Sequence, residues 1–162
     1  MTDLTASKPA ETSSDIISID AQATTEDELA VENASNENAS NSTERELVLT
    51  LQRFLRDQGE AYSEAAIRDL PATPSVTFSP AEMVSVLREI GYVASFGRIS
   101  ANNLTQNHCP MIGFWEDGGA FILTEIKPDG TVKYASLENK LKIKKMSKDQ
   151  FSAKFSGHLI LA

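Results

Sequence analysis

The chain has 162 residues, a formal net charge of -8 and a single cysteine. One cysteine excludes an internal disulfide framework and a cysteine-based zinc site. No apolar run approaches the ~20 residues that span a bilayer, and no HExxH, CxxC, GxGxxG or Walker-type motif is present. We therefore expect no metal and no cofactor.

The acidic charge is concentrated at the N-terminus. Residues 1–43 carry nine acids and one base, whereas residues 44–162 carry fourteen of each. Residues 1–42 are rich in Ser, Thr, Asn and acidic side chains and lack aromatic residues, which predicts a disordered acidic tail before a domain of residues 43–162. The tail is either an inert spacer or a shield for a cleft. A neutral domain with an acidic tail predicts no nucleic-acid partner.

The domain is predicted to begin with a helix in TERELVLTLQRFLRDQG. Thr43 has the position of an N-cap, and Glu46 follows at the spacing of a capping box. Leu47, Leu51, Phe54 and Leu55 share one face of this helix, and Gly59 ends it.

Two further helices are predicted before the sequence turns to strands. Ser63 starts a short helix that Pro71 stops. In SPAEMVSVLREIG, Ser79 is the N-cap, Pro80 occupies the first helical position, Glu82 completes a capping box and Gly91 ends the helix.

After Gly91 the hydrophobic period changes from helical toward two. The expected strands are YVASFGRI, PMIGFW, AFILTEI, TVKYASL, KLKIKK and GHLILA, with hairpin turns at EDGG and KPDG. SANNLTQN is expected to be a polar connection with one helical turn, and Ser147 caps a short helix through Gln150. The fold class is therefore α+β, with three N-terminal helices packed on an antiparallel sheet. The lysines of residues 140–154 form either a solvated face or an anion-binding or membrane-facing surface.

Cys109 and His108 are the parts of a cysteine peptidase, but they are neighbours in a predicted extended segment. Their side chains would diverge, so we expect a small buried thiol at the start of a strand. Pairing of Cys109 with His158 has no support in the sequence. Phe114 and Trp115 are predicted to face opposite sides of the sheet, with one of them exposed beside a Gly-rich hairpin as a peptide-contact residue.

The ordered part resembles a known family in the order and spacing of its segments. These are LVLTLQRFLRDQG, YSEAAIRDLP, FSPAEMVSVLREIGYVAS, CPMIGFWEDGGAFILTEI and MSKDQFSAKFSGHLILA, of which WEDGGAFILT and FSGHLIL are the most telling. The chain is similar to the bacteriocin-processing, papain-like cysteine peptidase domain of certain ABC exporters. It looks most like the inactive, peptidase-like N-terminal domain of type I secretion ABC transporters for haemolysin-type RTX toxins and large adhesins.

The resemblance implies that the catalytic positions have lost their chemistry. Glu46 stands where active members have the nucleophilic cysteine, and Ala120 stands where they have the histidine. The third position falls near Ser136 or Leu137, and the glutamine of the oxyanion hole would lie near Ser40, where no glutamine occurs. The missing histidine is more like the large-adhesin branch than the toxin exporters.

The implied function is binding without cleavage. The expected cleft residues are Glu46, Phe114, Trp115 and Ala120. The expected partners are an unfolded secreted polypeptide and the transmembrane and nucleotide-binding domains of a parent transporter, at the cytoplasmic face of the bacterial inner membrane. We expect an excised cytoplasmic domain. The alternatives are a regulatory module that contacts only other exporter domains, and a cysteine peptidase that uses Cys109.

Overall fold

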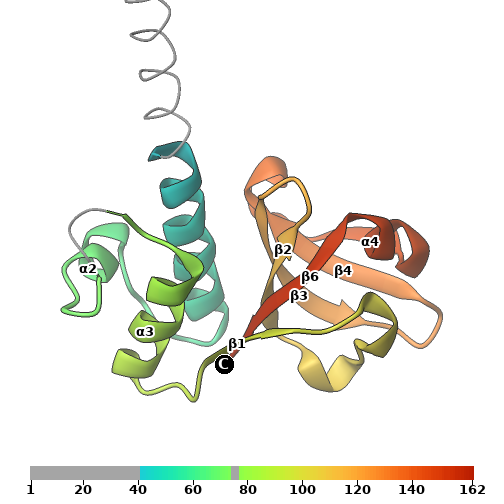
Figure 1. Ribbon diagram of the computed structural model, residues 1–162, viewed down its shortest axis with the longest axis horizontal. Coiled ribbons are helices and arrows are strands. Elements are labelled where there is room, and N and C mark those ends of the chain that lie inside the picture. The colour runs from blue at the N-terminus through green and yellow to red at the C-terminus, as the bar shows by residue number, and fades with distance from the viewer. Residues whose placement is uncertain (1–40, 74–76) are drawn as a thin grey trace, which may run out of the picture. The chain divides into compact units, whose positions relative to one another are not determined.

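The computed structural model describes residues 41–73 and 77–162 (Figure 1). Residues 41–162 form one compact unit. The tail predicted for residues 1–42 lies outside the described residues, apart from its last two positions.

The first helix carries one error of prediction and one success. Residues 41–57 are helical, so the predicted N-cap at Thr43 is wrong, because Thr43 already lies inside the helix. The end at Gly59 is confirmed. Gly59 has φ +92°, and the amide of Glu60 donates to the carbonyl of Leu55 at 2.9 Å, which closes the helix in the manner of a Schellman motif.

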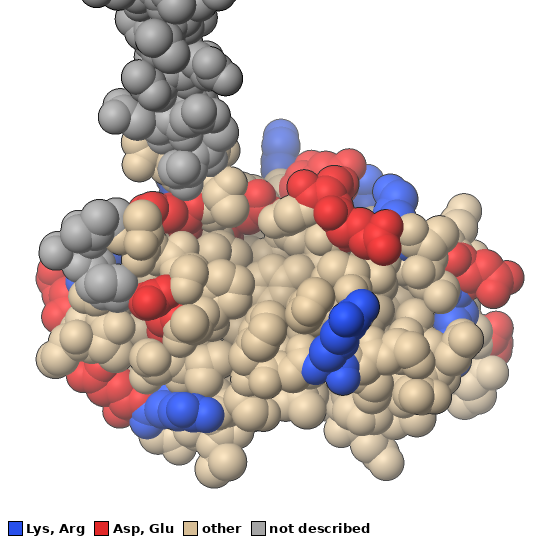
Figure 2. Space-filling view, in the orientation of Figure 1, with Lys and Arg blue, Asp and Glu red and all other residues tan. Residues whose placement is uncertain are grey.

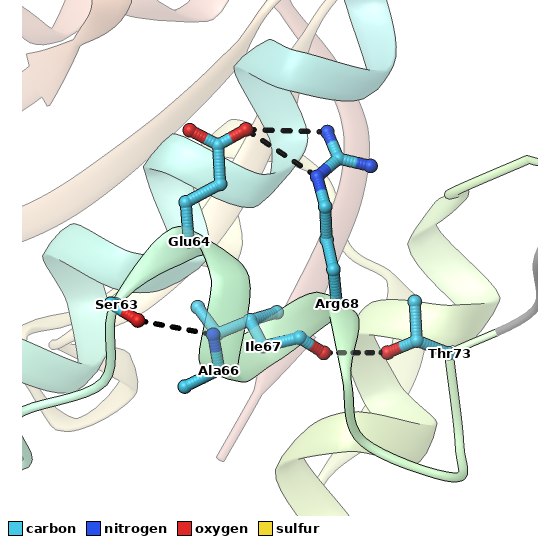
Figure 3. A network of polar contacts seen from close by, with 6 residues as sticks. All are labelled: Ser63, Glu64, Ala66, Ile67, Arg68 and Thr73. Carbon is cyan, nitrogen blue, oxygen red and sulfur yellow. Dashed lines mark hydrogen bonds and ion pairs between the residues drawn. The ribbon is translucent and has the colours of Figure 1, made fainter.

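The short helix α2, Glu64–Arg68, is held by polar contacts at both ends (Figure 3). The Oγ of Ser63 accepts from the amide of Ala66 at 3.0 Å, as the sequence predicts. The hydroxyl of Thr73 donates to the carbonyl of Ile67 at 2.8 Å, which fixes the chain after the helix. Glu64 and Arg68 lie 3.4 Å apart one turn from each other, an exposed pair that contributes little.

Helix α3, Pro80–Ile90, has the predicted capping box and ends at Gly91. The Oγ of Ser79 accepts from the amide of Ala81, and the Glu82 carboxylate accepts from the amide of Ser79 at 3.0 Å. The Ser79 hydroxyl also donates to that carboxylate, and this bond is the main cause that lowers the pKa of Glu82. Local sequence thus fixes the start of α3.

Replacing Ser79 with alanine is expected to lower the free energy of unfolding by about 1 kcal/mol. The amides of Ala81 and Glu82 in the first turn lose the Ser79 Oγ as their acceptor. Urea unfolding of the full chain measures the change. The control is Ser85→Ala, which removes an exposed hydroxyl from the middle of the same helix. Equal stability of the two variants would contradict the capping role.

The described residues form a sheet of six strands in the order β1-β6-β2-β3-β4-β5, and every neighbouring pair is antiparallel. The hairpins predicted at EDGG and KPDG are confirmed as the β2–β3 and β3–β4 connections. The helix that Ser147 caps is α4. The bounds are β1 Ser95–Arg98, β2 Met111–Trp115, β3 Ala120–Ile126, β4 Thr131–Ser136, β5 Lys144–Ser147, α4 Lys148–Lys154 and β6 Phe155–Leu161.

Two connecting segments differ from expectation. The strand predicted over residues 140–145 begins only at Lys144, because Lys140 and Leu141 both have φ +56° and turn the chain after the 3-10 turn Leu137–Asn139. The polar connection before β2 holds two 3-10 turns, Ala101–Asn103 and Gln106–His108. Both cases are loops whose geometry the strand pattern did not capture.

The two faces of the sheet bury different cores. The first helix, α2 and α3 pack on one face, and α4 packs on the other (Figure 1). The α+β class with N-terminal helices on an antiparallel sheet is confirmed. On the helix side the sheet contributes Ile112, Phe114, Ala120, Ile122 and Ile160; on the α4 side it contributes Met111, Trp115, Phe121, Leu123, Val132, Tyr134, Phe155 and Leu159.

Candidate functional site

A cavity of about 480 Å³ opens where the first helix meets the end of the β2–β3 hairpin. Three segments far apart in the sequence form its wall: the first helix, the hairpin, and the chain that leaves β4. Such a junction between layers is a usual place for a binding site. The lining residues are Glu46, Trp115, Asp117, Gly119, Ser136, Leu137 and Glu138.

Glu46 ties the helix to the hairpin. Its Oε1 accepts from the backbone amide of Ala120 at 3.0 Å, across 74 positions of sequence. Gly119 makes this approach possible, because a Cβ at that position would lie 3.2 Å from Cδ1 of Trp115 and 3.3 Å from Oε1 of Glu46. Glu46 therefore contacts the hairpin, and the capping role predicted for it is wrong.

The other two positions implied by the resemblance reach the same cavity. Ser136 ends β4 and Leu137 follows it, and both line the wall. Ser136 is 1% exposed, and its Oγ has no hydrogen-bond partner. The backbone amide of Ser136 donates to Oδ1 of Asn139 at 3.2 Å, which shapes the turn after β4. The structure thus brings Glu46, Ser136 and Leu137 to one cavity. Ala120 adjoins it only through its backbone amide, because its side chain is buried in the helix-side core and does not line the wall as expected.

The two adjacent aromatic residues face opposite sides of the sheet, as predicted, but neither is exposed. Phe114 is 8% exposed and packs in the helix-side core; Trp115 is 9% exposed and packs in the α4-side core. Trp115 stacks on Phe121 with ring centroids 3.9 Å apart and also lines the cavity. Phe114 is absent from the cavity wall. The expectation of an exposed aromatic is wrong, because both faces of the sheet are covered.

The wall of the cavity is acidic. Glu46, Asp117 and Glu138 contribute carboxylates, and within the described part of the chain no lysine, arginine or histidine lines the wall. Behind the wall, burial raises the pKa of Tyr134, and the charge of Glu138 raises it further. The cavity therefore favours a positively charged group over a negative one.

Cys109 and His108 lie elsewhere. His108 is in a 3-10 turn, where its Nδ1 lies 3.1 Å from the amide of Thr105, so the extended segment predicted at this position is wrong. Cys109 follows that turn and is half-buried, more open than expected. Burial raises the pKa of its thiol to about 11, and the nearby charge of Glu125 also raises it. A nucleophilic cysteine needs the opposite shift.

This thiol is expected to react slowly with iodoacetamide at pH 7, because only about one part in 10⁴ would be thiolate four pH units below its pKa. The rate should still rise through pH 9 and reach half of its maximum only near pH 11, where half of the thiol is ionised. The measurement is the alkylation rate of the full chain against pH, with glutathione as the reference thiol. A midpoint at or below pH 8 would contradict the burial of Cys109.

Two absences can be stated for the described part of the chain. Within residues 41–73 and 77–162, no three His, Cys, Asp or Glu side chains converge as metal ligands. In the same residues, no helix combines the length and apolar character required to span a membrane.

Three lining residues were missed by sequence reasoning: Asp117, Gly119 and Glu138. Asp117 and Gly119 belong to the EDGG turn, which the sequence identifies as a hairpin without showing what it approaches. Glu138 follows the predicted third catalytic position by one or two residues. The neighbourhood of Ser136 was therefore the available signal.

The fold and the cavity together define a papain-like peptidase architecture, and sequence comparison agrees. The profile of the Peptidase C39 family matches residues 38–162, so the chain belongs to this family. No curated protein gives a significant sequence match.

Solved structures with this fold include peptidase domains of transporters. One is the N-terminal peptidase C39 like domain of the toxin secretion ATP-binding protein from Vibrio parahaemolyticus, with TM-score 0.61 and 19% identity, covering 72% of this chain and 94% of that one. A double glycine motif protease from an AMS/PCAT transporter, in complex with the leader peptide, has TM-score 0.59 and 15% identity, covering 70% and 80%. The peptidase domain of Streptococcus ComA, a bi-functional ABC transporter, has TM-score 0.51 and 20% identity, covering 69% and 85%.

Proposed function

We propose that this chain is a non-catalytic peptidase-like domain of a type I secretion ABC exporter. It binds an unfolded secreted polypeptide, an RTX protein or a large adhesin, at the cytoplasmic face of the inner membrane. The contact between Glu46 and Ala120 carries the proposal, because it places a carboxylate and a methyl group where the family resemblance expects a thiol and an imidazole.

The chemistry of the cavity supports binding over cleavage. A cysteine peptidase needs a thiolate, a base within hydrogen-bond reach and a third group that orients the base. The described residues that line the cavity include neither cysteine nor histidine. Glu46 already accepts a hydrogen bond from the amide of Ala120. Neither Ser136 nor Leu137 has a carboxylate that would orient an imidazole.

His158 and Cys109 do not replace the missing catalytic groups. His158 lies on β6, where its ring stacks on Phe96 with centroids 5.7 Å apart. Cys109 precedes β2 and is outside the cavity wall. A peptidase that uses Cys109 would also have to overcome a pKa raised to about 11.

Peptide binding is supported by the fold and by the surface. A related domain of this fold was solved with a leader peptide bound. In the view of Figure 2, the central face of the domain carries few charged side chains. An extended polypeptide can lie along such a surface while selected side chains enter a cavity. Recruitment before export calls for weak binding, micromolar or weaker, or about -8 kcal/mol at most in magnitude.

The test of this function separates binding from cleavage. The full chain and its Cys109→Ser variant are incubated with an unfolded polypeptide, and the products are followed by mass spectrometry. We expect no cleavage by either protein and equal binding by both. Cleavage that disappears in Cys109→Ser would overturn the proposal in favour of a peptidase.

A further inference from the structure

The acidic cavity has the size of a ligand pocket. Its volume of about 480 Å³ lies within the range of roughly 300–1,000 Å³ that is common for ligand pockets. Three carboxylates share the wall, and the described residues that line it include no base to neutralise them. Two of these belong to the same corner: Oε1 of Glu46 and Oδ1 of Asp117 would lie 3.3 Å and 3.9 Å from a Cβ at Gly119.

This local charge contrasts with the charge of the domain. Residues 44–162 carry equal numbers of acids and bases, whereas the described residues of the cavity wall include three acids and no base. Like charges held around one hollow repel one another, and a cation in the hollow would relieve that repulsion.

A second observation points to a ligand. Ser136 belongs to the cavity wall, is 1% exposed, and leaves its Oγ without a hydrogen-bond partner. A buried hydroxyl without a partner is uncommon, because the lost hydrogen bond with water is not replaced. A ligand with several N–H donors would supply the missing partner. Trp115 adds an aromatic surface at the same wall.

We propose that this cavity binds a cationic side chain of the extended polypeptide, arginine in preference to lysine, through Glu46, Asp117 and Glu138. The inference rests on the proposed function and adds a specificity to it. Arginine is preferred because its planar guanidinium carries five donors for several acceptors and packs well on an aromatic ring.

The experiment uses the full chain and two blocked 20-residue peptides of Gly, Ser and Ala. One has a single central arginine, and the other has citrulline, which is similar in shape but neutral. Trp115 is the only tryptophan in the chain, so its fluorescence reports directly on the cavity. We expect the arginine peptide to bind about fivefold or more tightly, and this ratio to approach one in 1 M NaCl.

Isosteric variants identify the groups that recognise the charge. Asp117→Asn, Glu138→Gln and Glu46→Gln should each reduce the preference for arginine, and the amide of Glu46→Gln still offers an oxygen to Ala120. The matched control is Glu60→Gln, which removes an exposed carboxylate outside the cavity wall and should keep the full ratio.

Two outcomes would overturn the inference in different ways. If both peptides bind equally, or if the cavity variants keep the ratio, recognition of a cation is wrong while polypeptide binding stands. If neither these peptides nor a long unfolded polypeptide binds the chain, the proposed function fails together with the inference.

Discussion

Replacing Gly113 with alanine is expected to lower the free energy of unfolding by about 3 kcal/mol, at the upper end of the usual cost of overpacking. Gly113 pairs with Phe121 across the β2–β3 hairpin, and the Phe121 ring covers it. A Cβ at Gly113 would lie 2.8 Å and 2.9 Å from Cε2 and Cε1 of that ring. The Phe121 ring has no space to move away, because two rings pack against it. The ring centroid of Trp115, which stacks on it, is 3.9 Å away, and that of Phe151, which meets it edge-on, is 5.6 Å away.

Urea or thermal unfolding of the full chain measures this effect. The matched control is Gly97→Ala in the edge strand β1, because a Cβ at Gly97 would meet no atom within 4 Å. Two variants of equal stability would show that the Phe121 ring moves freely, which would contradict the close packing of the α4-side core.

Replacing Leu51 with alanine is expected to cost about 2–5 kcal/mol, the range for truncating a buried leucine. Leu51 is 0% exposed and lies in the helix-side core, where the first helix packs against α3 and the sheet. The same helix carries Glu46, so loosening it also weakens the contact between Glu46 and Ala120. We therefore expect this variant to lose polypeptide binding at temperatures below its unfolding midpoint.

The control for this prediction is Val93→Ala. Val93 is 95% exposed, so its truncation should change stability by no more than about 0.5 kcal/mol. Urea unfolding of the unsubstituted chain, Leu51→Ala and Val93→Ala gives the comparison, provided that the free energy of unfolding falls with the same slope against urea concentration in all three. A Leu51→Ala variant as stable as Val93→Ala would mean that the first helix is not part of the core.

Most of the fold follows from local signals in the sequence. The capping boxes at Ser79 and Ser147 and the Gly59 terminus fix helix ends through neighbours within a few residues. The hairpin turns fix strand pairing in the same way. These features are predictable because the atoms that satisfy the backbone belong to the same short segment.

The errors have one local cause and two causes in distant contacts. Thr43 carries a capping signal, yet the helix already includes Asn41, Ser42 and Thr43. Each of these polar residues lowers the stability of a helix only slightly. Glu46 accepts a hydrogen bond from the distant amide of Ala120 and does not cap its own helix. Phe114 and Trp115 alternate as expected, but burial of both requires covers on both faces of the sheet, which no strand pattern specifies.

The candidate site depends still more on tertiary structure. The family resemblance pointed to Glu46, Ala120, Ser136 and Leu137; the fold brings Glu46, Ser136 and Leu137 to the cavity wall and leaves the side chain of Ala120 in the core. Asp117 and Glu138 join them only because the hairpin and the turn after β4 converge on the first helix. Their shared charge is a property of this convergence, so sequence spacing gives no sign of it.

The most direct test of the central proposal is an NMR titration of the full chain with an unfolded, calcium-free RTX-type segment. The same segment folded in calcium is the control. We predict shifts for the unfolded form alone, clustered at Glu46, residues 115–120 and residues 136–138, with no cleavage products. No shifts with either form would contradict substrate recruitment, and cleavage would contradict the absence of catalysis.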